Sequence, residues 1–178
     1  MQRVLVMGSS GSGKSTFARR LSAITGIPTI SIDALFWRPG CVEPDRTAFR
    51  ERLAGAARQP RWIMDGNYTS HLVELRRDAC DTVIWFDLPR SACMRGILVP
   101  TATSFGRVRP EMSEGCPEKI DFKFFHYVWT FREKQRPRLL EYFRGLRPDQ
   151  SLICFTDRAQ ADDYLGELSP VSNRAPVH

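Results

Sequence analysis

Residues 8–15 read Gly8-Ser9-Ser10-Gly11-Ser12-Gly13-Lys14-Ser15 and fit the pattern GxxxxGK[ST] in full. An apolar run at residues 3–7 comes before this stretch, and a helical pattern from Lys14 to Thr25 follows it. Glycines let backbone N–H groups turn inward around a phosphate chain, and the start of a helix adds the positive end of its dipole. The stretch therefore predicts a strand, a loop that binds a nucleoside triphosphate, and a helix.

Two side chains of this loop have expected roles of their own. Lys14 reaches the β and γ phosphates, and the Ser15 hydroxyl coordinates Mg²⁺. The alternatives are a plain Gly/Ser turn at a helix start, and a dinucleotide fingerprint. The fingerprint is the weaker of these, because Thr16 stands at the position of its third glycine.

The rest of the chain alternates short apolar runs with helical patterns. The expected strands are residues 3–7, 29–32, 62–64, 82–86 and 151–155. The expected helices are residues 14–25, 46–58, 70–79, 90–98, 121–146 and 159–168, the fifth of them kinked or divided by Pro137. This order predicts an α/β fold with a parallel sheet covered on both faces. Residues 1–168 form one expected domain, and residues 169–178 are an expected flexible tail.

Charge and composition restrict the class of protein. Residues 90–147 hold 12 basic and 6 acidic side chains, and this surplus of 6 equals the formal net charge of +6 of all 178 residues. A regional positive field indicates an anionic partner, such as phosphate, nucleic acid or a membrane surface. No apolar run is long enough for a signal peptide or a membrane span, and the 5 cysteines form neither a disulfide framework nor a CxxC pair. We therefore expect a soluble, cytoplasmic protein with reduced thiols and no membrane partner.

Acidic residues at the ends of the expected strands are candidates for the site, because ligands of open parallel sheets bind beyond the carboxyl ends of the strands. Asp65 ends the third strand and is expected to hold Mg²⁺ directly or through water, with a simple Asp-Gly turn as the alternative. Asp33 ends the second strand and is expected to bind the acceptor or to act as its general base, with a helix N-cap as the alternative. Asp87 is expected to cap a turn.

A long irregular segment lies inside the basic region. Residues 99–120 contain three prolines and two glycines without a sustained period, which is typical of a functional or disordered loop. Arg107 and Arg109 stand in this segment, where a closing lid would bring them to a phosphoryl group in transit. The alternative for these two, and our interpretation of Lys134, Arg138, Arg144 and Arg147, is a solvated basic surface.

Aromatic residues are concentrated in one expected helix. Phe122, Phe125 and Trp129 fall at helical spacing there, so we expect them to pack in the core and not to stack on a base or a ring.

Several segments together resemble a known family. GSSGSGKST, IDALFWRPG, WIMDGNY and GRVRPEMSEGCPE, with the aromatic helix that follows, are similar to the bacterial DNA topology modulation proteins, which are themselves similar to adenylate and shikimate kinases. The resemblance covers about residues 2–168. It implies a P-loop NTPase with a five-stranded parallel sheet of nucleoside-monophosphate-kinase type, ATP as the donor, and a mobile lid at about residues 99–120. By the same resemblance Gly8 to Thr16 would bind ATP, Asp33 would face the acceptor, Asp65 would serve Mg²⁺, and Arg107 and Arg109 would be the lid arginines.

The sequence leaves three hypotheses for function. The first is a Mg²⁺-dependent kinase that moves the ATP γ-phosphate to a small acceptor: a nucleotide, a nucleoside or another hydroxyl compound. The second is a nucleic-acid-associated NTPase or regulator that uses residues 90–147, although no nucleic-acid-binding motif supports it. The third is a nucleotide-binding protein without transferase activity.

Overall fold

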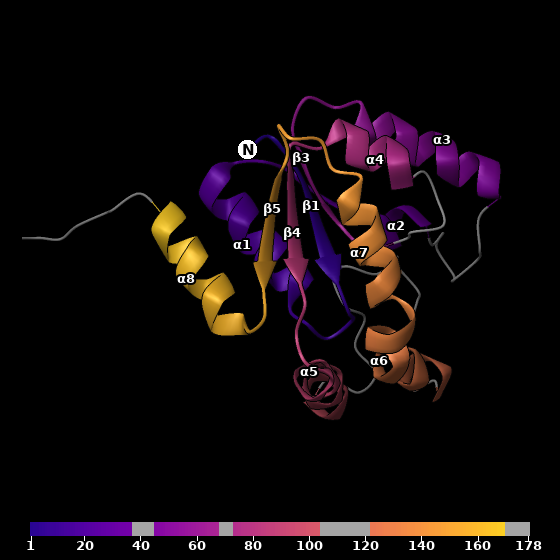
Figure 1. Cartoon of the computed structure of the whole chain (residues 1–178), viewed down its shortest axis with the longest axis vertical. Helices are drawn as coiled ribbons and strands as arrows, with labels where there is room; N and C mark the ends of the chain where they lie inside the picture. Colours follow the sequence, from indigo (N-terminus) through magenta and orange to yellow (C-terminus); the bar gives the residue numbers. More distant parts are fainter. Residues whose placement is uncertain (37–44, 68–72, 104–121, 170–178) are drawn as a thin grey trace, which may run out of the picture.

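The computed structural model describes residues 1–36, 45–67, 73–103 and 122–169. Its centre is a parallel sheet in the order β2-β3-β1-β4-β5 (Figure 1). The strands are β1 (Arg3–Gly8), β2 (Thr29–Ser31), β3 (Trp62–Asp65), β4 (Thr82–Phe86) and β5 (Ser151–Phe155). The prediction of five parallel strands is confirmed.

Helices cover both faces of the sheet, as the sequence predicted. One face packs against α1 (Lys14–Thr25), α5 (Arg90–Thr103) and α8 (Arg158–Leu168). The other face packs against α2 (Ile32–Phe36), α3 (Arg46–Ala57), α4 (Val73–Ala79) and α7 (Arg136–Arg144). Figure 1 shows α1 and α8 on one side of the strands and α3, α4 and α7 on the other. Among the described residues, no helix is both long enough and apolar enough to cross a membrane.

The central strand explains why the strands read as continuous apolar runs. In β1, Val4 and Val6 point into the core on the α1 side, whereas Leu5 and Met7 point into the core on the α3 side. All four side chains are fully buried. A strand with helices over both faces has no solvent-facing positions, so its sequence shows no alternation of apolar and polar residues.

Several boundaries differ from the prediction, and two of the differences bear on the site. The second strand ends at Ser31 and not at residue 32, because the Ser31 hydroxyl accepts a hydrogen bond from the Ala34 N–H at 3.2 Å and so begins α2. Residues 99–103 belong to α5 and not to the irregular segment expected at residues 99–120, and the rest of that expected segment, with the proposed lid, lies outside the described residues. Pro100 lacks an N–H, which removes one helical hydrogen bond, but its fixed φ angle is compatible with a helix.

The aromatic helix forms as predicted but faces a different way. It is divided into α6 (Phe122–Lys134) and α7, with the break at Gln135, two residues before Pro137. The expectation that Phe122 and Trp129 pack in the core is wrong, since these side chains are 88% and 51% exposed. The buried positions of α6 are Val128 and Phe131, because the stripe that meets the sheet lies on another part of the helix.

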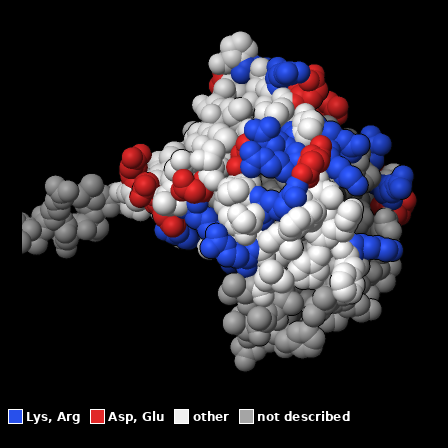
Figure 2. All heavy atoms as spheres, turned by 60° about the horizontal axis from the view of Figure 1, so that its bottom comes forward, with Lys and Arg blue, Asp and Glu red and all other residues white. Residues whose placement is uncertain are grey.

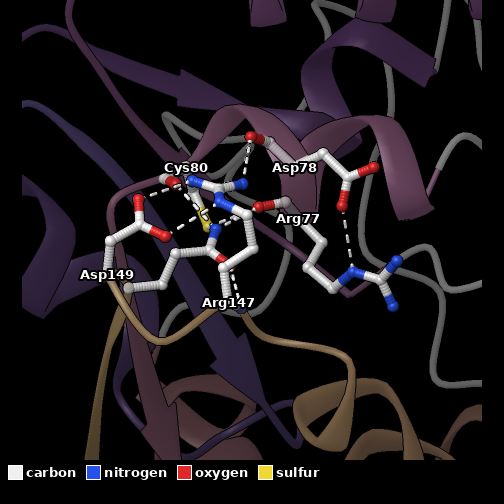
Figure 3. Close-up of polar contacts among 6 residues, drawn as sticks. Arg77, Asp78, Cys80, Arg147 and Asp149 are labelled. Atoms are coloured by element: carbon white, nitrogen blue, oxygen red, sulfur yellow. Dashed lines mark hydrogen bonds and ion pairs between the residues drawn. The ribbon is translucent and has the colours of Figure 1, made fainter.

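A cluster of polar contacts lies just before β4 and β5, at the amino-terminal ends of these parallel strands. Figure 3 shows these contacts. Gln150, directly before β5, accepts a hydrogen bond from the Arg147 N–H at 2.7 Å through Oε1. Its Nε2 donates to the Cys80 carbonyl at 2.7 Å. Arg147 lies on the surface, as expected, and also pairs with Asp149 at 3.0 Å. The cluster joins the end of α4 to the segment that connects α7 and β5.

Cys80 is expected to make stability depend on alkaline pH. Burial, supported by the negative charge of Asp81, raises the pKa of the Cys80 thiol from 9.0 to about 11. The folded protein therefore holds this proton more tightly than the unfolded chain, and the resulting stability is present below pH 9 and lost as the pH rises through 11. Urea titrations should show that the free energy of unfolding is smaller at pH 11 than at pH 8. In Cys80→Ala this difference should be smaller by about 1 to 2 kcal/mol. An equal loss in both proteins would contradict this expectation.

Candidate functional site

The loop after β1 has the form that phosphate binding requires. Gly11 and Gly13 adopt left-handed backbone conformations with φ of 74° and 102°, which side-chain-bearing residues rarely adopt. The Ser12 N–H donates to the Ser9 carbonyl at 3.3 Å, and the Phe17 N–H donates to the Gly13 carbonyl at 3.0 Å as α1 begins. The Lys14 ammonium donates to the Ser9 carbonyl at 2.9 Å, which holds it over the loop. The predicted strand, loop and helix are therefore confirmed as structural elements.

Helix α5 lies directly against this loop. A Cβ added to Gly96 would overlap the Gly11 carbonyl oxygen, so only glycine permits this approach of the two backbones. The Arg158 guanidinium, from the first turn of α8, donates to the same carbonyl at 2.7 Å. The thiol of Cys93 is also buried beside the loop; burial raises its pKa, although a hydrogen bond with Ser9 and the positive charge of Lys14 oppose the rise. The outer side of the loop is therefore packed from two helices.

Asn67 fixes the beginning of the loop. Its Oδ1 accepts a hydrogen bond from the Gly8 N–H at 2.9 Å, and its Nδ2 donates to the Gly8 carbonyl at 2.8 Å. Arg76 in α4 holds the turn that carries Asn67, since it donates to the Asn67 carbonyl at 2.7 Å and to the Gly66 carbonyl at 3.4 Å. Arg76 is fully buried, and this burial lowers its pKa to about 10.

Asp65 lies at the carboxyl end of β3, beside the loop. It is the register partner of Val6 in β1, two residues before Gly8. Its side chain is 9% exposed with Oδ1 buried, and Ser15 stands at the start of α1 on the loop. A carboxylate and a hydroxyl supply the hard oxygen ligands that Mg²⁺ prefers, with nucleotide phosphates and water completing its shell. These residues therefore fit a magnesium ion bound together with a nucleotide.

Asp33 lies one strand further out, at the exposed end of β2. It is in the first turn of α2 and does not cap this helix, since Ser31 does so. The Tyr127 hydroxyl of α6 lies near both Asp33 and Asn67. Burial raises the pKa of this hydroxyl, a hydrogen bond with Asn67 lowers it, and the negative charge of Asp33 raises it again. Tyr127 therefore lies beside Asn67, and the charge of Asp33 acts on its hydroxyl from the end of β2.

The basic region contributes less free charge than its composition suggested. Arg136 pairs with Asp87 through three contacts of 2.8 to 3.0 Å, so Asp87 forms an ion pair and does not simply cap a turn. Arg90 pairs with Glu133 and lies 4.5 Å from the ring centre of Trp129. Figure 2 shows the same mixture, with acidic side chains among the basic ones on this face. Arg107 and Arg109, the predicted lid arginines, lie outside the described residues.

Kinases are among the solved structures with this architecture. A shikimate kinase from Bacteroides thetaiotaomicron superposes with a TM-score of 0.54 and 14% identity, covering 94% of this chain and 96% of its own. A gluconokinase from Sinorhizobium meliloti superposes with a TM-score of 0.53 and 15% identity, covering 94% and 89%. The chain has the fold of a P-loop kinase.

No family model matches the sequence. No curated protein matches it either. The resemblance to the topology modulation proteins therefore stays a prediction, whereas the P-loop kinase fold that it implied is confirmed.

Sequence reasoning missed four residues that shape the loop. They are Asn67, Arg76, Gly96 and Arg158. One signal was available for Arg76, because it falls at helical spacing within the apolar stripe Leu72, Leu75 and Ala79, where an arginine must be paired internally. The contacts of Asn67, Gly96 and Arg158 join segments that are far apart in the sequence, and only the folded chain brings them together.

The contact between α5 and the loop can be tested by Gly96→Ala. The added methyl group has to displace the Gly11 backbone, so we expect affinity for MgATP to fall by at least about tenfold and stability to fall by about 1 to 3 kcal/mol. Calorimetric titration and urea unfolding measure the two effects. Gly55→Ala is the matched control, because a Cβ on Gly55 in α3 meets nothing within 4 Å. Equal MgATP affinity in both variants would contradict the expected contact.

Proposed function

We propose that this protein is an ATP-dependent phosphotransferase that moves the γ-phosphate to a small-molecule acceptor. The proposal rests mainly on one observation: a complete GxxxxGK[ST] loop lies between β1 and α1, with the Asp65 carboxylate at the neighbouring strand end. The P-loop kinase fold supports the same activity. The acceptor is a nucleotide, a nucleoside or another hydroxyl compound.

The loop is proposed to bind the triphosphate of ATP through its backbone. The N–H groups of residues 8–16 and the positive end of α1 attract the phosphate oxygens. The Lys14 ammonium exchanges its contact with the Ser9 carbonyl for contacts with the β and γ phosphates. Ser15 and Asp65 would hold Mg²⁺, which supplies charge neutralisation to the phosphates when bound.

In the transfer step, an acceptor oxygen forms a bond with the γ-phosphorus while the bond from that phosphorus to the β–γ bridging oxygen breaks, and ADP leaves. A hydroxyl acceptor gives its proton to the Asp33 carboxylate, whereas a phosphate acceptor is already a nucleophile and needs no base. Arg107 and Arg109 are proposed to neutralise the charge on the transferred group.

Lys14→Ala tests the nucleotide side of this proposal. Loss of the ammonium removes a charged hydrogen bond to the phosphates, so we expect the transfer rate to fall by about 10²- to 10³-fold and MgATP affinity to fall with it. Lys134→Ala is the matched control, because Lys134 is an exposed lysine at the end of α6. If Lys14→Ala binds MgATP and turns it over like the control, the proposal is wrong.

A screen of nucleotides, nucleosides, sugars and other hydroxyl compounds identifies the acceptor. Mass spectrometry detects a product heavier by one phosphate, and the same reaction without acceptor gives the hydrolytic background. Transfer to any compound above this background supports a kinase. MgATP binding without transfer to any member of the panel would favour a nucleotide-binding protein instead.

Asp33→Asn tests the acceptor side. The amide keeps the shape of the side chain but cannot take a proton, so transfer to a hydroxyl acceptor should fall by about 10²- to 10⁴-fold. MgATP affinity should stay unchanged, since Asp33 lies beyond β3 from the loop. Steady-state rates and calorimetric titration separate these two effects. An unchanged rate with a hydroxyl acceptor would remove Asp33 as the base.

A further inference from the structure

The side-chain amide of Asn67 occupies the place of a missing backbone contact in the sheet. Strands β1 and β3 pair in parallel from Arg3 opposite Trp62 to Val6 opposite Asp65. The same register, continued by two residues, sets Gly8 opposite Asn67. The Gly66 N–H still donates to the Val6 carbonyl at 3.2 Å, and there the backbone pairing ends. Beyond that point it is the Asn67 side chain that pairs with Gly8.

An amide group is chemically suited to this substitution. It carries one carbonyl oxygen and N–H donors in one plane, as a peptide group does. Oδ1 accepts from the Gly8 N–H at 2.9 Å and Nδ2 donates to the Gly8 carbonyl at 2.8 Å, so both backbone groups of Gly8 are satisfied by a single side chain. On its other side Gly8 is the register partner of Phe86 in β4. Gly8 is thus held between two neighbours at the point where the phosphate-binding loop leaves the sheet.

The amide itself has a rigid support. Buried Arg76 donates to the Gly66 and Asn67 carbonyls and fixes the turn from behind. This turn also follows Asp65 directly. Gly66 and Asn67 therefore connect the carboxylate proposed for Mg²⁺ to Gly8, the first residue of the phosphate-binding loop. Arg76 is a cation without an exposed surface, and it donates to two backbone oxygens of this turn.

We propose that Asn67 is a positioning residue whose side-chain amide extends the pairing of β3 with β1 to Gly8 and thereby fixes the phosphate-binding loop relative to Asp65. This inference rests on the proposed binding of MgATP to that loop. A loop that is correctly placed for only part of the time binds more weakly in proportion to that fraction. The amide is therefore expected to contribute to nucleotide affinity without touching the nucleotide.

Asn67→Asp is the most informative substitution. A carboxylate of the same shape still accepts from the Gly8 N–H, but it cannot donate to the Gly8 carbonyl and repels it. We expect MgATP affinity, measured by calorimetric titration at pH 8, to fall by about tenfold or more.

The chain offers a matched control at the opposite end of the sheet. Gln150 also bridges two backbone groups through its side-chain amide, accepting from the Arg147 N–H and donating to the Cys80 carbonyl. Gln150→Glu makes the same chemical change within the cluster of Figure 3, far along the strands from the phosphate-binding loop. It should lower the melting temperature while leaving MgATP affinity as in the wild type. Equal loss of affinity in both variants, or no loss in Asn67→Asp, overturns the inference.

A second measurement needs no nucleotide. In the ligand-free protein, hydrogen exchange followed by NMR should find the Gly8 amide protected, and Asn67→Ala should make it exchange much faster while amides in the middle of β1 stay protected. Unchanged protection of Gly8 in the folded Asn67→Ala protein contradicts the role of Asn67. If the wild type fails to bind MgATP, the proposed function fails, and the exchange experiment still decides whether Asn67 holds Gly8.

Discussion

The close approach of other backbone segments to the loop after β1 is the constraint on which the candidate site depends. Gly8 lies against the Phe86 carbonyl, which a Cβ on Gly8 would approach to 2.6 Å. Three residues further on, the Gly11 carbonyl meets Gly96 of α5 and the guanidinium of Arg158. Backbone N–H groups bind phosphate only when the loop is held in one conformation. Tight packing around the glycines supplies that rigidity, because backbone packs directly against backbone there and no flexible side chain lies between the two segments.

The two ends of the parallel sheet have different tasks. At the carboxyl end the chain leaves β1, β2 and β3 in turns that carry Lys14, Asp33 and Asp65, and these turns surround the candidate site. At the amino end, Gln150 and Arg147 bind backbone carbonyls and acidic groups and close the sheet. All strands run in the same direction, so their amino-terminal ends lie at one edge of the sheet and their carboxyl-terminal ends at the other. The contacts of Gln150 and Arg147 therefore lie away from the candidate site.

Charge and aromatic content were poor guides to position. The basic region suggested a field of unpaired arginines, yet Arg136 is held by Asp87, which lies outside that region. Helical spacing suggested that Trp129 was buried, yet it is half exposed beside Arg90. Spacing shows which side chains share a helix face but not which face meets the sheet. Composition, in the same way, counts charges without their partners. Both properties depend on how helices dock, and docking is decided by contacts between distant segments.

The sequence by itself determined the strands, most helix boundaries, their parallel arrangement and the loop from Gly8 to Ser15, because these follow from local patterns of apolar residues, glycines and prolines. It also selected Asp33 and Asp65 as strand-end acids. Only the tertiary structure revealed that Asn67 continues the pairing of β3 to Gly8 and that Arg76 supports it from within the core. These contacts depend on strand register and on a buried helix face, which arise when segments fifty or more residues apart pack together, as Gly8 and Asn67 do at a separation of 59.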